Sequence, residues 1–215
     1  MRISYAIVAH PQRLHQAQQL SHTLGGIPIA LDTPRRGGTY GGQNHDRALI
    51  LANTAEEHSD WVCVLEDDAE PVTDFLTQLP EALAACPTSA ASLYLGNQRS
   101  PRRAEKLGQL LPEDPHWIVT DTLLHAVCFA IRTPLLHELL TTVENVTRLD
   151  ADQRYGYGLR RMGGYQIAHT TSSLVEHADD EPVIGRRRDR QPRTEPRKAL
   201  KVGGRTVWAN TYLTL

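Results

Sequence analysis

The sequence of 215 residues lacks several features that would fix its class at once. It has no run of about 18 apolar residues, so we expect no membrane-spanning helix. Its first residues, "MRISYAIVAHPQR", hold too short an apolar stretch for a signal peptide. The three cysteines show no CxxC spacing and leave an odd one over, which favours a reduced setting. These absences predict a cytoplasmic protein.

Charge is present but unevenly distributed. The formal net charge is −2, yet residues 186–205 hold nine Arg and Lys against Asp189 and Glu195, a local charge of +7. Such a segment suits an anionic partner, either a pyrophosphate or a nucleic acid such as DNA. A solvated flexible arm is the alternative reading. The length and the apolar content of 40% predict one domain, residues 1–185, followed by a basic C-terminal segment, residues 186–215.

Strand-like and helix-like segments alternate along the chain, which predicts an α/β fold with a mostly parallel central sheet flanked by helices. Strands are expected at 3–10, 27–32, 60–69, 91–97 and 165–177, paired extended segments at 117–133, and helices at 11–24, 46–57, 73–86 and 134–146. An acid-led segment follows at 149–164; its run Tyr-Gly-Tyr-Gly is poor helix material and predicts a loop or an irregular turn.

Polar residues stand where the first three strands are expected to end. His10 follows the first, Asp32 the second, and Glu66-Asp67-Asp68 the third. The carboxyl ends of parallel strands share one edge of a sheet, where ligands bind. Side chains alternate along a strand, so Glu66 and Asp68 should face the same way and suit a hard divalent cation. A helix cap is the competing interpretation, although a cap needs only one acid.

The segment "VCVLEDDAEPVTDF" resembles the Asp-x-Asp region of nucleotide-sugar glycosyltransferases of the GT-A fold, most closely the family-25-like group. Three later segments resemble the same pattern in the same order: "LLHAVCFAIRTPLLHELL", "LDADQRYGYGLRRMGGYQI" and "SLVEHADDEPVIG". The chain is also similar to small glycosyltransferase-like proteins of actinobacteriophages. Some phage transferases glycosylate hydroxymethylated bases of DNA, which would suit the basic segment.

This resemblance implies a metal-dependent glycosyltransferase with a GT-A-like catalytic domain, a Mn²⁺ or Mg²⁺ cofactor and a nucleotide-sugar donor, most simply a UDP-sugar. It implies that Asp68 and His177 bind the metal, with Glu66 at the ribose or a metal-bound water and Asp67 between the two acids. It implies Asp152 as the catalytic base of an inverting reaction, with Asp150 as second choice. The donor-binding residues that it implies are His10, Pro11, Arg13, Asp32, Asn44, Arg47, Glu66, Asp67 and Arg186.

Two alternatives stay open at this point. A nucleotidyltransferase would share the sheet and its acids, but it is expected to carry a glycine-rich loop after the first strand, and "VAHPQRLH" has no glycine. A nucleotide- or DNA-binding module without transferase activity fits the same residues. The sequence does not choose between inversion and retention, and it does not predict the oligomeric state.

Overall fold

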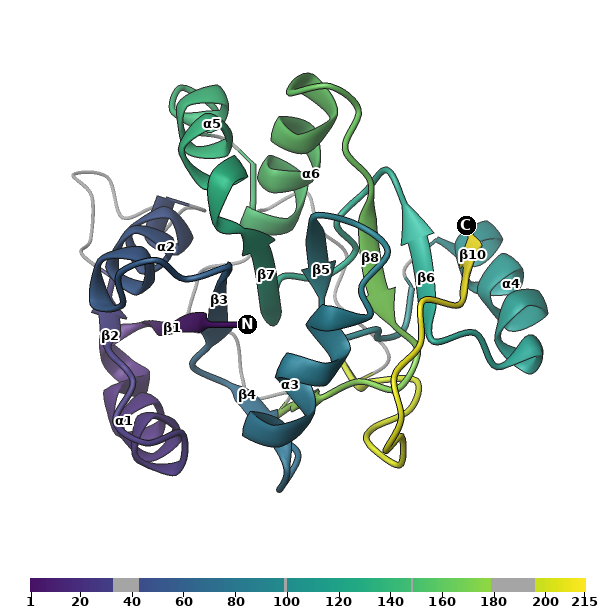
Figure 1. Ribbon diagram of the computed structural model, residues 1–215, viewed down its shortest axis with the longest axis horizontal. Helices are drawn as coiled ribbons and strands as arrows, with labels where there is room; N and C mark the ends of the chain where they lie inside the picture. The colour runs from purple at the N-terminus through teal and green to yellow at the C-terminus, as the bar shows by residue number, and fades with distance from the viewer. Residues whose placement is uncertain (33–42, 99, 148, 179–195) are drawn as a thin grey trace.

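A computed structural model describes residues 1–32, 43–98, 100–147, 149–178 and 196–215, and helices alternate with strands along much of it (Figure 1). The strands are β1 (Ile3–Ala9), β2 (Ile29–Leu31), β3 (Trp61–Glu66), β4 (Ala69–Pro71), β5 (Ala90–Ser92), β6 (Trp117–Thr120), β7 (Cys128–Arg132), β8 (Ile167–Thr170), β9 (Val175–His177) and β10 (Tyr212–Thr214). The helices are α1 (Leu14–Thr23), α2 (Gln43–Ala55), α3 (Phe75–Ala84), α4 (Pro101–Leu110), α5 (Thr133–Val143) and α6 (Ala151–Arg161), with short 3-10 turns η1 (Pro11–Arg13) and η2 (Leu111–Glu113). None of these helices is long and apolar enough to cross a membrane.

The centre of the molecule is an eight-stranded sheet in the order β10-β6-β8-β5-β7-β3-β1-β2. Strands β1, β2, β3, β5 and β8 run in one direction, and β7, β6 and β10 run in the other. A separate two-stranded sheet pairs β4 with β9. The predicted α/β class with a large, mostly parallel sheet between helices is therefore confirmed.

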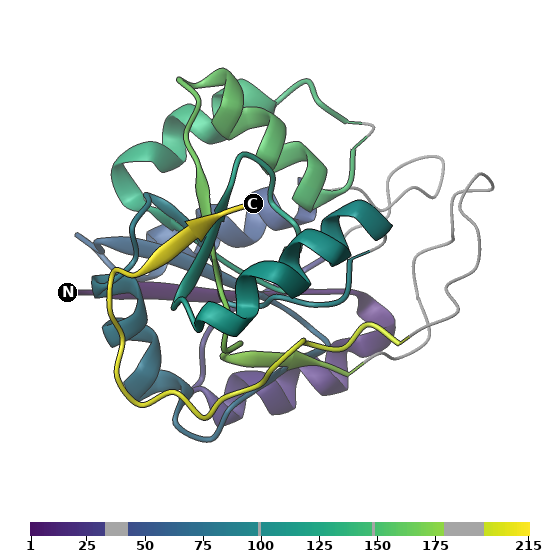
Figure 2. The ribbon, with the colours of Figure 1, turned by 90° about the vertical axis from the view of Figure 1, so that its right-hand side faces the viewer.

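Helices cover both faces of the sheet because its strands are apolar on both sides. In β3, Trp61, Cys63 and Leu65 face a core shared with α1 and α3. Val62 and Val64 point the other way, into a core shared with α2, α5 and α6. The two helical layers lie on opposite sides of the sheet in both ribbon views (Figures 1 and 2). This sandwich leaves the ends of the strands as the edge where polar groups can gather.

The Tyr-Gly-Tyr-Gly run lies inside α6, so the prediction of a loop or an irregular turn is wrong. Packing outweighs the low helix propensity of glycine here. A Cβ on Gly158 would lie 2.5 Å from Val143 Cγ1, and one on Gly156 would lie 3.0 Å from the backbone nitrogen of Leu123. Glycine thus lets α6 approach its neighbours closely.

Other elements also differ from the prediction. The extended segment expected at 165–177 is two strands, β8 in the main sheet and β9 in the small one. The extended segments within 117–133 are both strands, but β6 and β7 do not pair, because β8 and β5 lie between them. The strand expected at 91–97 is the shorter β5. Helix α4 was not predicted, although Ser100 before Pro101 is a typical start: the Ser100 hydroxyl accepts a hydrogen bond from the Arg103 N–H.

Residues 196–215, the described end of the basic segment, pack against the main sheet (yellow in Figure 2). Ala199 bridges to Gly96, and β10 extends the sheet beside β6. The Trp208 ring lies 5.7 Å from the Trp117 ring, and its indole N–H donates to Gln78 Oε1 at 3.0 Å. These contacts hold the end of the chain along β9 and the sheet.

His169 in β8 is fully buried and neutral. Its Nε2 accepts a hydrogen bond from the Leu124 N–H at 3.1 Å, so the ring proton sits on Nδ1, 3.3 Å from the Ile118 carbonyl. Burial lowers the pKa of His169 from 6.5 to about 3, and nearby His125 acts in the same direction. The folded protein therefore resists protonating this ring, whereas the unfolded chain does not.

We expect His169 to make the protein less stable in acid. Between pH 6.5 and about 3 the unfolded state binds a proton at this ring that the folded state excludes, so stability falls as the pH falls. The contribution is about 1.4 kcal/mol for each pH unit at most. Urea melts from pH 7 to pH 4 should show a flatter dependence for His169→Gln than for the unaltered chain. His22→Gln, at an exposed position, is the matched control, and parallel curves for His169→Gln and the unaltered protein would refute the assignment.

Candidate metal centre

The first three strands bring their polar ends to one edge of the sheet. The parallel register of β1 and β3 places Val8 beside Glu66, and the N–H of His10 donates to Asp67 Oδ2 at 2.7 Å. On the other side of β1, the Asp32 N–H donates to the Ala9 carbonyl at 2.8 Å. The predicted meeting of these strand ends is confirmed.

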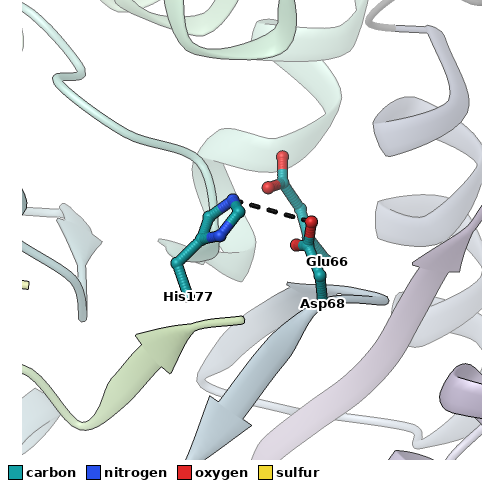
Figure 3. A group of neighbouring side chains, drawn as sticks. All are labelled: Glu66, Asp68 and His177. Atoms are coloured by element: carbon teal, nitrogen blue, oxygen red, sulfur yellow. Dashed lines mark ion pairs between the residues drawn. The ribbon is translucent and has the colours of Figure 1, made fainter. Parts of the chain in front are cut away.

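The small sheet of β4 and β9 carries His177 to the same place. Its antiparallel register pairs Ala69 with His177, and the N–H of Ala178 donates to the Asp68 carbonyl at 3.0 Å. The imidazole then points at the acid: His177 Nε2 lies 3.6 Å from Asp68 Oδ2, and Glu66 stands next to both (Figure 3). The pairing of β4 with β9 thus brings Asp68 and His177, far apart in sequence, next to each other.

Glu66, Asp68 and His177 form a group that could hold a metal ion. One ligand atom from each residue lies within 4.8 Å of the others. Asp68 is only 6% exposed, and its Oδ1 has no hydrogen-bond partner among the residues that the structure describes. A buried carboxylate oxygen without a partner is costly, and a cation would relieve both that cost and the repulsion between two neighbouring acids. The residues therefore fit a divalent ion bound by two carboxylates and one imidazole.

Arg13 is the main counter-charge inside the site. Its buried guanidinium donates to Asp67 Oδ1 at 3.2 Å and also to Asp68 Oδ2. Burial would lower the pKa of Arg13, but the two carboxylates outweigh it and raise that pKa. Burial raises the pKa of Asp67, and the bonds from His10 and Arg13 only partly oppose this. Arg13 thus binds the acids directly in this structure, beside the group that fits a cation.

His45 is the partner of Glu66. His45 Nε2, at the start of α2, lies 3.2 Å from Glu66 Oε1. Burial would raise the pKa of Glu66, but His45, together with the charges of His177 and Arg197, lowers it below its ordinary value. Glu66 is therefore kept in the ionised form that a metal requires.

The other residues that the resemblance implied for the donor are partly assembled. Arg47 Nη2 lies 3.4 Å from Asp32 Oδ1 and donates to Asn44 Oδ1 at 2.5 Å, so these three form a second polar group beyond β2. Pro11 opens η1 at an exposed position. Arg186 lies outside the described residues.

The two candidate bases lie at the start of α6. Asp150 is the residue before the helix, and Asp152 is in its first turn, where Oδ1 accepts the Gln153 N–H at 2.7 Å. Neither belongs to the group of Glu66, Asp68 and His177. Their helix is linked to that group through α2, because Arg154 and the Tyr155 hydroxyl both donate to Asp46, at 2.5 and 2.8 Å.

Sequence reasoning missed three contributors to the centre. His45 contacts Glu66. Two residues of the described end of the basic segment reach β9: Lys198 Nζ donates to the His177 carbonyl at 2.8 Å, and the Ala199 N–H donates to Glu176 Oε1 at 2.8 Å. The only signal in the sequence was the position of His45 and Asp46 at the start of a helix after a glycine-rich stretch. Nothing in the sequence indicated that Lys198 would fold back onto His177.

The ends of β1, β2 and β3 therefore carry a group that fits a cation, a buried arginine and a second polar group. No protein-family model matches the chain, and no curated protein matches it in sequence. What the chain does has to be argued from the chemistry of these side chains.

Proposed function

We propose that the protein is a metal-dependent glycosyltransferase that moves a sugar from a nucleotide-diphosphate sugar to an acceptor hydroxyl. The observation that carries the proposal is the convergence of Glu66, Asp68 and His177 where β1, β2 and β3 end. In α/β sheets this edge is where nucleotides bind, and two carboxylates with one imidazole leave coordination positions for phosphate oxygens. The GT-A-like resemblance of "VCVLEDDAEPVTDF" points the same way.

In the proposed reaction Asp68 and His177 hold Mn²⁺ or Mg²⁺, with Glu66 as the third ligand. When bound, such an ion neutralises the charge that develops on a departing diphosphate. Arg13 is a second cation at the same edge, and its planar guanidinium suits phosphate oxygens. The Asp32, Asn44 and Arg47 group is assigned to the nucleoside of the donor, a UDP-sugar in the simplest case.

The acceptor side is assigned to the start of α6. In an inverting reaction Asp152 would accept the proton of the acceptor hydroxyl, a role typically worth about 10²–10⁴-fold in rate. Asp150 is the second choice, and in a retaining reaction either acid would position the sugar. We propose a hydroxymethylated base of DNA as the acceptor, because the basic segment contacts β9 through Lys198, beside the metal centre.

The full chain should release nucleoside diphosphate from at least one nucleotide sugar when Mn²⁺ is present, and EDTA should stop the release. A panel of UDP-, GDP- and dTDP-sugars with coupled detection of the diphosphate measures this. Adding duplex DNA that contains hydroxymethylated bases should speed the release and place the sugar on the DNA, as read by mass spectrometry. Binding of a nucleotide without release from any donor would refute the transferase and favour a binding module.

A further inference from the structure

Glu66 is the least enclosed member of the metal group. Its side chain is 29% exposed, whereas those of Asp68 and His177 are 5% and 3% exposed. A glutamate also has more rotatable bonds than an aspartate or a histidine, so it loses more freedom when a metal fixes it. Something must restrain this side chain if all three ligands are to meet one ion.

His45 is placed to supply that restraint. Its side chain is 13% exposed, and Nε2 lies 3.2 Å from Glu66 Oε1. This nitrogen is buried and makes no hydrogen bond to any described residue, Glu66 included. Glu66 Oε1, already at ion-pair distance, is the acceptor that a small turn of the ring would let it serve. His45 is not in the group whose ligand atoms lie within 4.8 Å of one another, so it contacts a ligand without being one.

The position of His45 is itself fixed by α6. The Tyr155 ring meets the His45 ring edge-on at 6.4 Å. The next residue, Asp46, accepts hydrogen bonds from the Tyr155 hydroxyl and from fully buried Arg154. The first turn of α2 is therefore bonded to α6 through Asp46, and it places the His45 imidazole beside Glu66 of the metal group.

We propose that His45 is a positioning residue for the metal centre: its Nε2–H donates to Glu66 and holds that carboxylate toward Asp68 and His177. The inference rests on the proposed function through its metal site. Asp46 bonds the same turn of α2 to α6. The contact between His45 and Glu66 therefore also connects Glu66 to the helix at whose start the two candidate bases lie. Outer partners of metal ligands typically account for about 10–100-fold in metal affinity.

The positioning role is tested by titrating the full chain with Mn²⁺ alone. Calorimetry and the loss of the EPR signal of free Mn²⁺ measure the binding. His45→Ala should weaken Mn²⁺ binding by about 10–100-fold with an unchanged melting temperature. His45→Gln, whose amide N–H can still donate, should recover most of the affinity. His15→Ala, an exposed histidine on α1, is the matched control and should bind as the unaltered chain does.

A double-mutant cycle makes the test specific. Because His45 acts through Glu66, His45→Ala should cost little further affinity once Glu66→Gln is present. Additive effects, an unchanged affinity in His45→Ala, or a loss as complete as that of His177→Ala would each overturn the positioning role. Absence of Mn²⁺ binding by the unaltered chain would instead remove the metal centre, and the proposed function with it.

Discussion

Asp68→Asn is expected to lower sugar-nucleotide turnover by about 10³-fold and to abolish measurable Mn²⁺ binding, because it removes the charge of the buried carboxylate of the metal group. Asparagine keeps the shape and one carbonyl oxygen. Arg13 retains Asp67 as a charged partner, so the fold should survive. Steady-state release of nucleoside diphosphate, together with a thermal melt of the same sample, measures both effects.

Glu70→Gln is the matched control for this experiment. Glu70 lies two residues further along, in β4, and is exposed. Its neutralisation removes one negative charge near the site without touching the metal group, so turnover should change little. Equal losses in the two variants would show that general charge, and not coordination by Asp68, sets the activity.

Arg154→Met is expected to destabilise the protein by about 3–5 kcal/mol, because it empties a fully buried site of its charge and leaves the half-buried carboxylate of Asp46 without its ion-pair partner. Arg154 is fully buried, and it also donates through Nε and Nη2 to the Val143 carbonyl, at 3.2 and 2.7 Å. Losing these bonds removes the contact of Arg154 with α5 and leaves the Tyr155 hydroxyl as the remaining donor from α6 to Asp46 of α2. For a chain of this size the melting temperature should fall by roughly 10 °C, as measured by calorimetry.

Arg161→Met provides the comparison on the same helix. Arg161 is exposed, so the same loss of charge there should shift the melting temperature by no more than about 2 °C. Adding Asp46→Asn to Arg154→Met should recover part of the stability, since a neutral amide is cheaper to bury alone than a carboxylate. A double variant as unstable as the sum of the two singles would contradict the ion-pair explanation.

The sequence was most informative about the strand ends, because the pattern of apolar residues shows where each strand stops. Apolar runs ending at His10, Asp32 and Glu66 were enough to predict that these residues meet, because parallel strands align their carboxyl ends. The approach of His177 to Asp68 was implied by the resemblance alone. In the structure it depends on the ladder of β4 and β9, two strands of three residues each that carry no periodic signal.

The sequence was least informative where packing between distant segments decides. Gly156 and Gly158 look like a break in a helix until Leu123 and Val143 are seen to press against them. His45 looks like an ordinary polar residue at a helix start, because only the seating of α2 on β1 and β3 takes it to Glu66. No local pattern encodes either contact.

The candidate metal centre draws its parts from segments far apart along the chain: Arg13 in η1, Glu66 and Asp68 at the end of β3, and His177 in β9, followed by Lys198. The ribosome releases these parts in that order, and closing a loop between segments so far apart is entropically slow. A growing polypeptide would therefore carry the acids long before it carries their imidazole partner. Competence to bind the ion would arise only once His177 has been made and has paired with Ala69 through β9 and β4.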